Sequence, residues 1–121
     1  MKRKKIDFNY KGKKFSLEVG VCNFFWKIIG LMFTRRRKAK ALLFDFKQLT
    51  RGGIHSYFVF FPFIAVWLDD KNKVVDVKLV KPFNPIIKSK KPFFRLVEIP
   101  VNKEYKDVVK FLSSTRDLAR N

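Results

Sequence analysis

Apolar and polar residues alternate with a period of two near the start of the chain. Residues 6–10 and 15–19 place an apolar side chain at every second position, and the sequence KGK lies between them at 11–13. This period is typical of strands that bury one face, and a short glycine-containing connection favours a tight turn. We predict a two-stranded hairpin here.

A longer apolar run, YFVFFPFIAVWL, covers residues 57–68 and is followed by the polar sequence DDKNK and by VVDVKLV at 74–80. Aromatic and β-branched residues favour a pleated surface, so the two apolar stretches predict a second hairpin. The first arm is apolar on both faces, which indicates a central, covered strand. Pro62 cannot donate a ladder hydrogen bond and predicts a bulge, bend or strand break.

Shorter patterns complete the predicted architecture. Strands are expected at 41–46 and 94–99, loops at 47–53 and 81–95, and a helix near 103–112, within a helical region reaching about 119, with Asn102 as its cap. Residues 23–29 have helical spacing: they are either an interfacial membrane helix or, the interpretation we favour because no polar face is present, a core-covering helix. The pattern predicts a mainly β fold (all-β or α+β), a small antiparallel barrel-like domain of six or seven strands with one or two short helices, spanning 1–121 as one domain.

Composition supports a folded chain. Of the 121 residues 47% are hydrophobic and 17% aromatic, which is too apolar for a disordered protein. The single cysteine, Cys22, excludes an internal disulfide and favours a reducing, cytoplasmic setting. We expect neither a secretory signal nor a membrane-spanning helix, since the longest apolar run is shorter than the ~20 residues needed and contains a proline.

The formal net charge is +18. This excess indicates a polyanionic partner, either nucleic acid or an anionic membrane surface. The alternative is compositional: many Lys, Phe, Ile and Asn residues are what an AT-rich genome encodes without selection for binding. Both interpretations stay open, and the sequence does not predict an oligomeric state.

Two basic loops are the candidate polyanion-binding sites, at 35–40 and 88–95. Their cations would neutralise phosphates, and the exposed rings expected at Phe83 and Phe93 would stack on unpaired bases. The predicted contact residues are Arg35, Arg36, Arg37, Lys38, Lys40, Lys88, Lys90, Lys91 and Arg95.

No pattern typical of catalysis is found. One His and one Cys cannot supply a metal site, and no phosphate-binding Gly-rich loop is present, so neither a metal nor a cofactor is expected. His55 and Ser56 are neighbours whose side chains point to opposite faces of a strand, so they do not form a catalytic dyad. His55 and Glu98 either line a small-ligand or enzymatic pocket or have structural roles. We favour a non-enzymatic chain.

The order of several short motifs resembles the uncharacterised prokaryotic DUF family 192, also called UPF family 0127. The resemblance spans roughly residues 20–102 and depends on GLMF at 30–33, ALLFDF at 41–46, IH at 54–55, FP at 61–62, VWLD at 66–69, VV at 74–75, KP at 81–82 and EIP at 98–100. It implies a compact, mostly β, barrel-like domain with one or two short helices, and it implies no activity.

This chain departs from the family pattern around its Phe-Pro motif. Relatives have a basic residue and a Met just before it and an acidic residue after it, where this chain has the apolar residues Phe60, Val59 and Ile64. Val101 and Asn102 stand where relatives have a small residue and Gly. A family site built on that basic and acidic pair would be absent here, so no active site is transferred.

Overall fold

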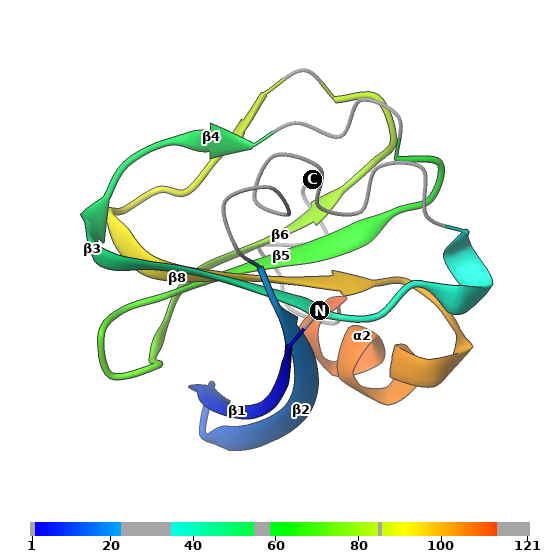
Figure 1. Cartoon of the computed structure of the whole chain (residues 1–121), viewed down its shortest axis with the longest axis horizontal. Helices are drawn as coiled ribbons and strands as arrows, with labels where there is room; N and C mark the ends of the chain where they lie inside the picture. The colour runs from blue at the N-terminus through cyan, green and yellow to red at the C-terminus, as the bar shows by residue number, and fades with distance from the viewer. Residues whose placement is uncertain (1, 23–34, 55–58, 85, 114–121) are drawn as a thin grey trace.

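The computed structural model describes residues 2–22, 35–54, 59–84 and 86–113. The chain is mostly β (Figure 1). In sequence order the elements are β1 (Arg3–Tyr10), β2 (Lys13–Val21), the 3-10 helix η1 (Arg36–Lys38), β3 (Leu42–Thr50), β4 (Gly53–Ile54), β5 (Phe63–Leu68), β6 (Val74–Val80), β7 (Ile87–Lys88), β8 (Phe93–Pro100), the 3-10 helix η2 (Lys103–Tyr105) and α2 (Lys106–Ser113).

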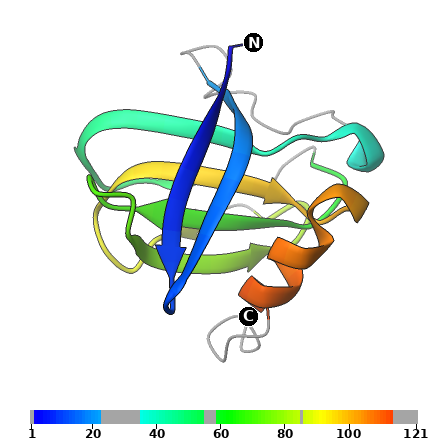
Figure 2. The same cartoon turned by 90° about the horizontal axis from the view of Figure 1, so that it is seen from below.

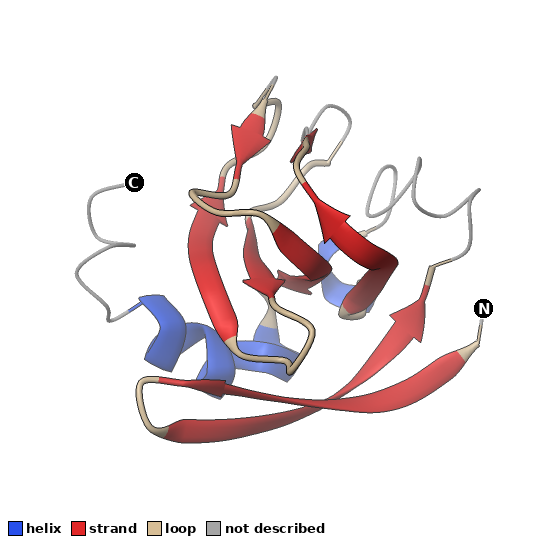
Figure 3. Cartoon of the chain, turned by 90° about the vertical axis from the view of Figure 1, so that its left-hand side faces the viewer, coloured by secondary structure: helices blue, strands red, loops and turns tan. Residues whose placement is uncertain are grey.

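Six strands form one sheet in the order β1-β2-β3-β8-β5-β6, and β4 and β7 form a separate two-stranded ribbon. The sheet curls into a half-barrel, as the view along its side shows (Figure 3). All its pairs are antiparallel except β2 with β3, which is parallel. The outer strands β1 and β6 approach each other at one bridge, between Asn9 and Lys73 just before β6. The predicted mainly β, barrel-like fold is confirmed.

The first hairpin is formed as the alternation predicts. Ile6 and Phe8 of β1 are buried opposite Leu17 and Phe15 of β2, while the residues between them are exposed. The turn at Lys11 and Gly12 has positive φ at both positions (49° and 80°). A two-residue turn of this kind matches the right-handed twist of the flanking strands.

Strand β5 is the central, covered strand that the second apolar run predicts. All six of its side chains are buried, and β8 and β6 flank it on either side. The strand begins at Phe63, directly after Pro62, which confirms the strand break predicted at this proline; the described residues 59–62 of the apolar run precede the strand. Pro62 has no N–H to donate, but its carbonyl accepts a hydrogen bond from Val101 N at 3.0 Å.

The central strands separate two hydrophobic cores. One lies between the sheet, the curled β1–β2 hairpin and α2 (Figure 2), and it contains Phe8, Leu43, Val97 and Leu112 among others. The other lies on the opposite face and contains Trp67 and the segment before β5. Successive side chains of β5 enter alternate cores, which explains why a strand without alternation is fully buried.

Two segments predicted as loops contain strands. β3 continues to Thr50, past an irregular register that begins after Asp45, where Lys47 has a φ of 59°. Within the predicted loop at 81–95, Ile87 and Lys88 pair with β4, and β8 begins at Phe93. A Cβ atom at Gly53 would lie only 2.9 Å from Cγ1 of Ile86. Glycine, which has no Cβ, therefore allows β4 and β7 to pair this closely.

The C-terminal helical region is confirmed over residues 103–113. Asn102 caps it as predicted, since its side-chain oxygen accepts a hydrogen bond from Glu104 N at 3.1 Å. The helix predicted near 23–29 and the end of the predicted helical region at 114–119 lie outside the described residues.

Candidate polyanion-binding groove

A groove of about 710 Å³ lies between η1 and the segment formed by η2 and α2. Five of the nine side chains around it are cationic, and none of the nine is acidic. Its lining residues are Arg36, Arg37, Val101, Asn102, Lys103, Lys106, Val109, Lys110 and Ser113.

The helical repeat of α2 aligns the lysines of the groove. Lys103, Lys106 and Lys110 follow one another at intervals of three and four residues, which places them on one side of a helical segment. Tyr105 and Leu112 are buried in the core beneath. The segment therefore anchors itself by its apolar side chains, and its three lysines border the groove.

Hydrogen bonds hold the opposite wall in place. Arg36 Nε donates to Val101 O at 2.7 Å, and Asn102 Nδ2 donates to Arg36 O at 2.9 Å and to Ala39 O at 3.0 Å. The short η1 helix has no buried residue of its own, so these contacts position Arg36 and Arg37 against the η2–α2 segment. They join positions more than sixty residues apart in the sequence.

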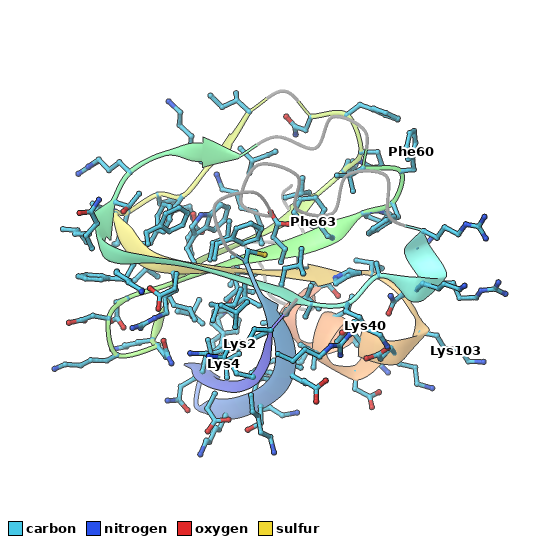
Figure 4. The ribbon with its side chains drawn as sticks, viewed as in Figure 1. Lys2, Lys4, Lys40, Phe60, Phe63 and Lys103 are labelled. Carbon is cyan, nitrogen blue, oxygen red and sulfur yellow. The ribbon has the colours of Figure 1, made fainter. Side chains whose placement is uncertain are left out.

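Lys40 belongs to the same end of the molecule, near Lys103 (Figure 4), but it is ion-paired. Its ammonium donates to a carboxylate oxygen of Glu104, and this hydrogen bond is the main cause that lowers the pKa of that carboxyl below its usual value. Arg35 and Lys38 are exposed beside the groove and do not line it.

The second predicted cluster lies at the other end of the long axis. The start of β8 is on the left of Figure 1 and η1 is on the right, and the view from below agrees (Figure 2); β7 lies beside β4, above the sheet in Figure 1. Lys88 and Lys91 border a hollow of about 250 Å³ together with Arg51. Lys90 donates its backbone N–H to Asp76 Oδ2 at 2.7 Å. The two basic loops therefore do not form one continuous face.

Arg95, the last of the predicted contact residues, is half-buried and bonded within the fold. Its Nε donates to Asp45 Oδ2 at 3.2 Å, and its Nη1 donates to Asn72 Oδ1 at 2.8 Å and to Asp70 O at 3.2 Å. The guanidinium thereby joins β3 and β8 to the turn between β5 and β6. The structure gives Arg95 a structural role that the sequence alone did not indicate.

Glu98 is buried in β8 between Leu42 of β3 and Ala65 of β5. Within the part of the chain that the structure describes, no hydrogen bond to its carboxyl is found. Burial raises the pKa of this carboxyl to about 8. His55, its predicted pocket partner, lies outside the described residues, and the residues described include no group of three that could hold a metal ion.

The two rings predicted as stacking platforms differ. Phe83 is 53% exposed, but Phe93 is only 3% exposed, so the prediction is wrong for Phe93. Phe93 is the first residue of β8, and its ring packs against those of Phe46 and Trp67, with centroids 5.7 and 6.4 Å apart. Phe93 is buried because the strand that it begins packs against the core.

The model of the family DUF192, "Uncharacterized ACR, COG1430", matches residues 6–106, which is most of the chain. The chain belongs to this family. The match extends the resemblance of residues 20–102 in both directions and includes both walls of the groove up to Lys106. The chain matches no curated protein.

Two crystal structures share the DUF192 fold seen here. One is a candidate transcription regulator from Sinorhizobium meliloti 1021, with a TM-score of 0.71 and 20% identity over 93% of this chain and 84% of that one. The other is a protein of unknown function from Novosphingobium aromaticivorans, with a TM-score of 0.73 and 11% identity over 93% of this chain and 80% of that one. At these identities the likeness concerns the fold alone.

The sequence analysis missed the three lysines of the groove that come from the η2–α2 segment. They lie at 103, 106 and 110 within the helix predicted near 103–112, and no binding role was assigned to that helix. No sequence signal placed this helix beside residues 35–40.

In the described part of the chain, no helix is long and apolar enough to cross a membrane.

Proposed function

We propose that this DUF192 protein is a non-catalytic module that binds nucleic-acid phosphates through the groove between η1 and α2. The observation that carries the proposal is the convergence of Arg36, Arg37, Lys103, Lys106 and Lys110 on one cavity whose lining includes no carboxylate.

Cations held at fixed positions suit a phosphate backbone. Each phosphate that a lysine or arginine neutralises releases condensed counterions, which drives binding and makes it salt-dependent. Arg36 is oriented by its bond to Val101 O, so less side-chain freedom is lost when a phosphate binds. A nucleic-acid strand in the groove would have the lysines of the η2–α2 segment along one side and Arg36 and Arg37 along the other.

The floor of the groove indicates which part of a nucleic acid is recognised. Val101 and Val109 offer no aromatic face for base stacking, and among the described lining residues only Asn102 and Ser113 are neutral and polar. The side-chain amide of Asn102 already donates its hydrogen bonds to Arg36 O and Ala39 O. Contacts of this kind bind phosphates and carry little sequence information. We therefore expect binding with weak sequence preference.

The enzymatic alternative near His55 and Glu98 finds no support among the residues described. Glu98 is only 6% exposed and lies among apolar residues of the sheet.

The decisive experiment is a salt titration of binding to a single-stranded RNA, comparing two double variants of equal charge change. Lys106→Gln with Lys110→Gln removes two cations from the groove, and Lys88→Gln with Lys91→Gln removes two from the opposite end. For single strands the slope of log K against log salt is about −0.7 per phosphate contact, so five contacts predict roughly −3.5. The groove variant should lose about 1.4 of that slope, and the control variant should keep it.

An equal loss in the two variants would show that binding follows net charge and would contradict a site at the groove. Absence of RNA binding by the unmodified chain at low salt would eliminate the proposed function. Heparin and duplex DNA, assayed in the same way, separate a preference for single strands from general affinity for polyanions.

A further inference from the structure

Two aromatic rings project from neighbouring loops on the face of the sheet that does not carry α2. Phe60 precedes β5 and is 60% exposed, and Phe83 follows β6 and is 53% exposed. Their ring centroids are 5.4 Å apart in an edge-to-face arrangement with an interplanar angle of 76°. Figure 4 shows Phe60 at the periphery, pointing away from the sheet, whereas Phe63 points inward. Ile86, three residues beyond Phe83, is 58% exposed as well.

The chain holds these two rings (Phe60 and Phe83, the aromatic tip) outward, although burying them would be favourable. Phe83 has a φ of +62°, a left-handed backbone that a bulky residue adopts only at a cost. Val59 and Phe61, on either side of Phe60, are both buried in the core on this face. The exposed rings are thus fixed by a well-packed base and are not loose ends of the chain.

The charges beside the tip are positive. A hollow of about 270 Å³ next to it is lined by Ile86 and Ile87, by Leu79 and Asn84, and by three lysines: Lys78, Lys81 and Lys88. None of these lining residues is acidic. Lys78 is oriented by a hydrogen bond from its Nζ to Lys88 O.

We propose that the aromatic tip inserts into the interface of an anionic lipid bilayer, with these lysines contacting the headgroups. Phe side chains that protrude from a convex surface enter the boundary between headgroups and acyl chains, and adjacent lysines are attracted to anionic lipid. The tip consists of two exposed rings, which suits a bilayer better than the extended complementary surface that a stable protein partner needs. This site is separate from the basic groove and does not depend on the proposed function.

Co-sedimentation with vesicles tests the proposal. The full chain should bind phosphatidylglycerol vesicles more tightly than phosphatidylcholine vesicles. Phe60→Ser with Phe83→Ser should weaken this binding by about tenfold or more, because apolar area no longer leaves water. Leu49→Ser is the matched control: Leu49 is 62% exposed in β3, so its loss should leave binding unchanged. All variants alter exposed side chains, and circular dichroism checks that they fold.

A second measurement reports insertion directly. Phe60→Trp adds a fluorophore at the tip, and bromine-labelled lipids should quench the emission of this variant more than that of the unmodified chain. Equal quenching, or vesicle binding that the double serine variant retains and Lys106→Gln with Lys110→Gln abolishes, would overturn the proposal in favour of electrostatic adsorption through the groove. It would also be overturned if the serine variant abolished self-association and left vesicle binding intact, since the tip would then be a protein contact.

Discussion

Arg95 and Glu98 lie three residues apart on β8, and their surroundings give their charges opposite consequences. The Arg95 guanidinium has a carboxylate and three further oxygens within hydrogen-bond distance, so its charge is satisfied where it lies. The Glu98 carboxyl is buried opposite Leu42 and Ala65, and burial penalises its ionised form.

Glu98 should make stability depend on pH. The pKa of its carboxyl is about 8 in the folded chain against an ordinary value of 4.5, so between these values the folded state binds the proton and the unfolded state releases it. The free energy of unfolding therefore falls as pH rises through this window, by up to about 1.4 kcal/mol per pH unit. Urea titrations from pH 4 to 9 measure this slope.

Glu98→Gln provides the control, because an amide of similar shape cannot ionise. The variant should match the unmodified chain near pH 4 and become the more stable of the two as pH approaches 8. Parallel pH profiles for the two proteins would contradict an effect of the buried carboxyl.

Arg95→Met should destabilise the fold by about 2 kcal/mol, because the charge-assisted bonds of a half-buried guanidinium are lost and Asp45 keeps a partly buried charge. Arg3→Met is a matched control. Arg3 is also ion-paired, with Glu18, but both side chains are more than half exposed, and such surface pairs contribute little. Chemical unfolding measures the free energy of unfolding of both variants. Equal losses would show that the Arg95 contacts stabilise the fold no more than an exposed ion pair does.

At the scale of secondary-structure elements, Asn102 joins three pieces of the molecule. Asn102 follows the end of β8, its side-chain oxygen caps η2 by accepting from Glu104 N, and its side-chain nitrogen donates to Arg36 O and Ala39 O of η1 and its C-cap. This amide, together with the hydrogen bond from Arg36 Nε to Val101 O, fixes the position of η1 relative to the η2–α2 segment.

Asn102→Ala should lower the free energy of unfolding by about 1–2 kcal/mol, from the lost cap and from two carbonyls left without this donor. It should also weaken RNA binding at fixed salt without changing net charge. Asn9→Ala, at an exposed position of β1, is the control for the loss of an amide. RNA affinity that is unaffected by Asn102→Ala would show that the position of η1 does not matter for binding.

The elements that could be predicted are those whose burial repeats along the chain. The alternation of apolar and polar residues predicts the β1–β2 hairpin, and the uninterrupted apolar run predicts the covered strand β5. The β4–β7 ribbon was missed because two-residue strands are too short to show a period. The groove was missed for another reason: the hydrogen bond from Arg36 to Val101 spans 65 positions, and no local pattern specifies such a contact.

At the scale of the whole molecule, the charge of +18 is distributed over more than one site. Cations gather at the groove at one end of the long axis and around Lys88 and Lys91 at the other. Such an excess attracts polyanions at long range and at the same time makes the folded state repel itself.

Adding salt should therefore stabilise this chain. Between 10 and 150 mM NaCl the screening length falls from about 30 to about 8 Å, which weakens repulsion between distant lysines. We expect the thermal midpoint to rise by about 4 °C, corresponding to about 1 kcal/mol for a chain of this size. Scanning calorimetry at several salt concentrations measures it, and a midpoint that falls with salt would show that attractive ion pairs dominate.

Among the described strands, β1 is at a border of the sheet, and three consecutive cations with exposed side chains, Arg3, Lys4 and Lys5, begin it. Lys4 is labelled in Figure 4. An uncovered strand border offers backbone donors and acceptors to any similar border that it meets, and lysines there discourage such encounters. The cations at the start of β1 thus oppose edge-to-edge pairing between copies of the chain. It follows that a polyanion which coats this border also removes the repulsion between copies, so crowding many chains onto one long polymer would promote strand-to-strand assembly.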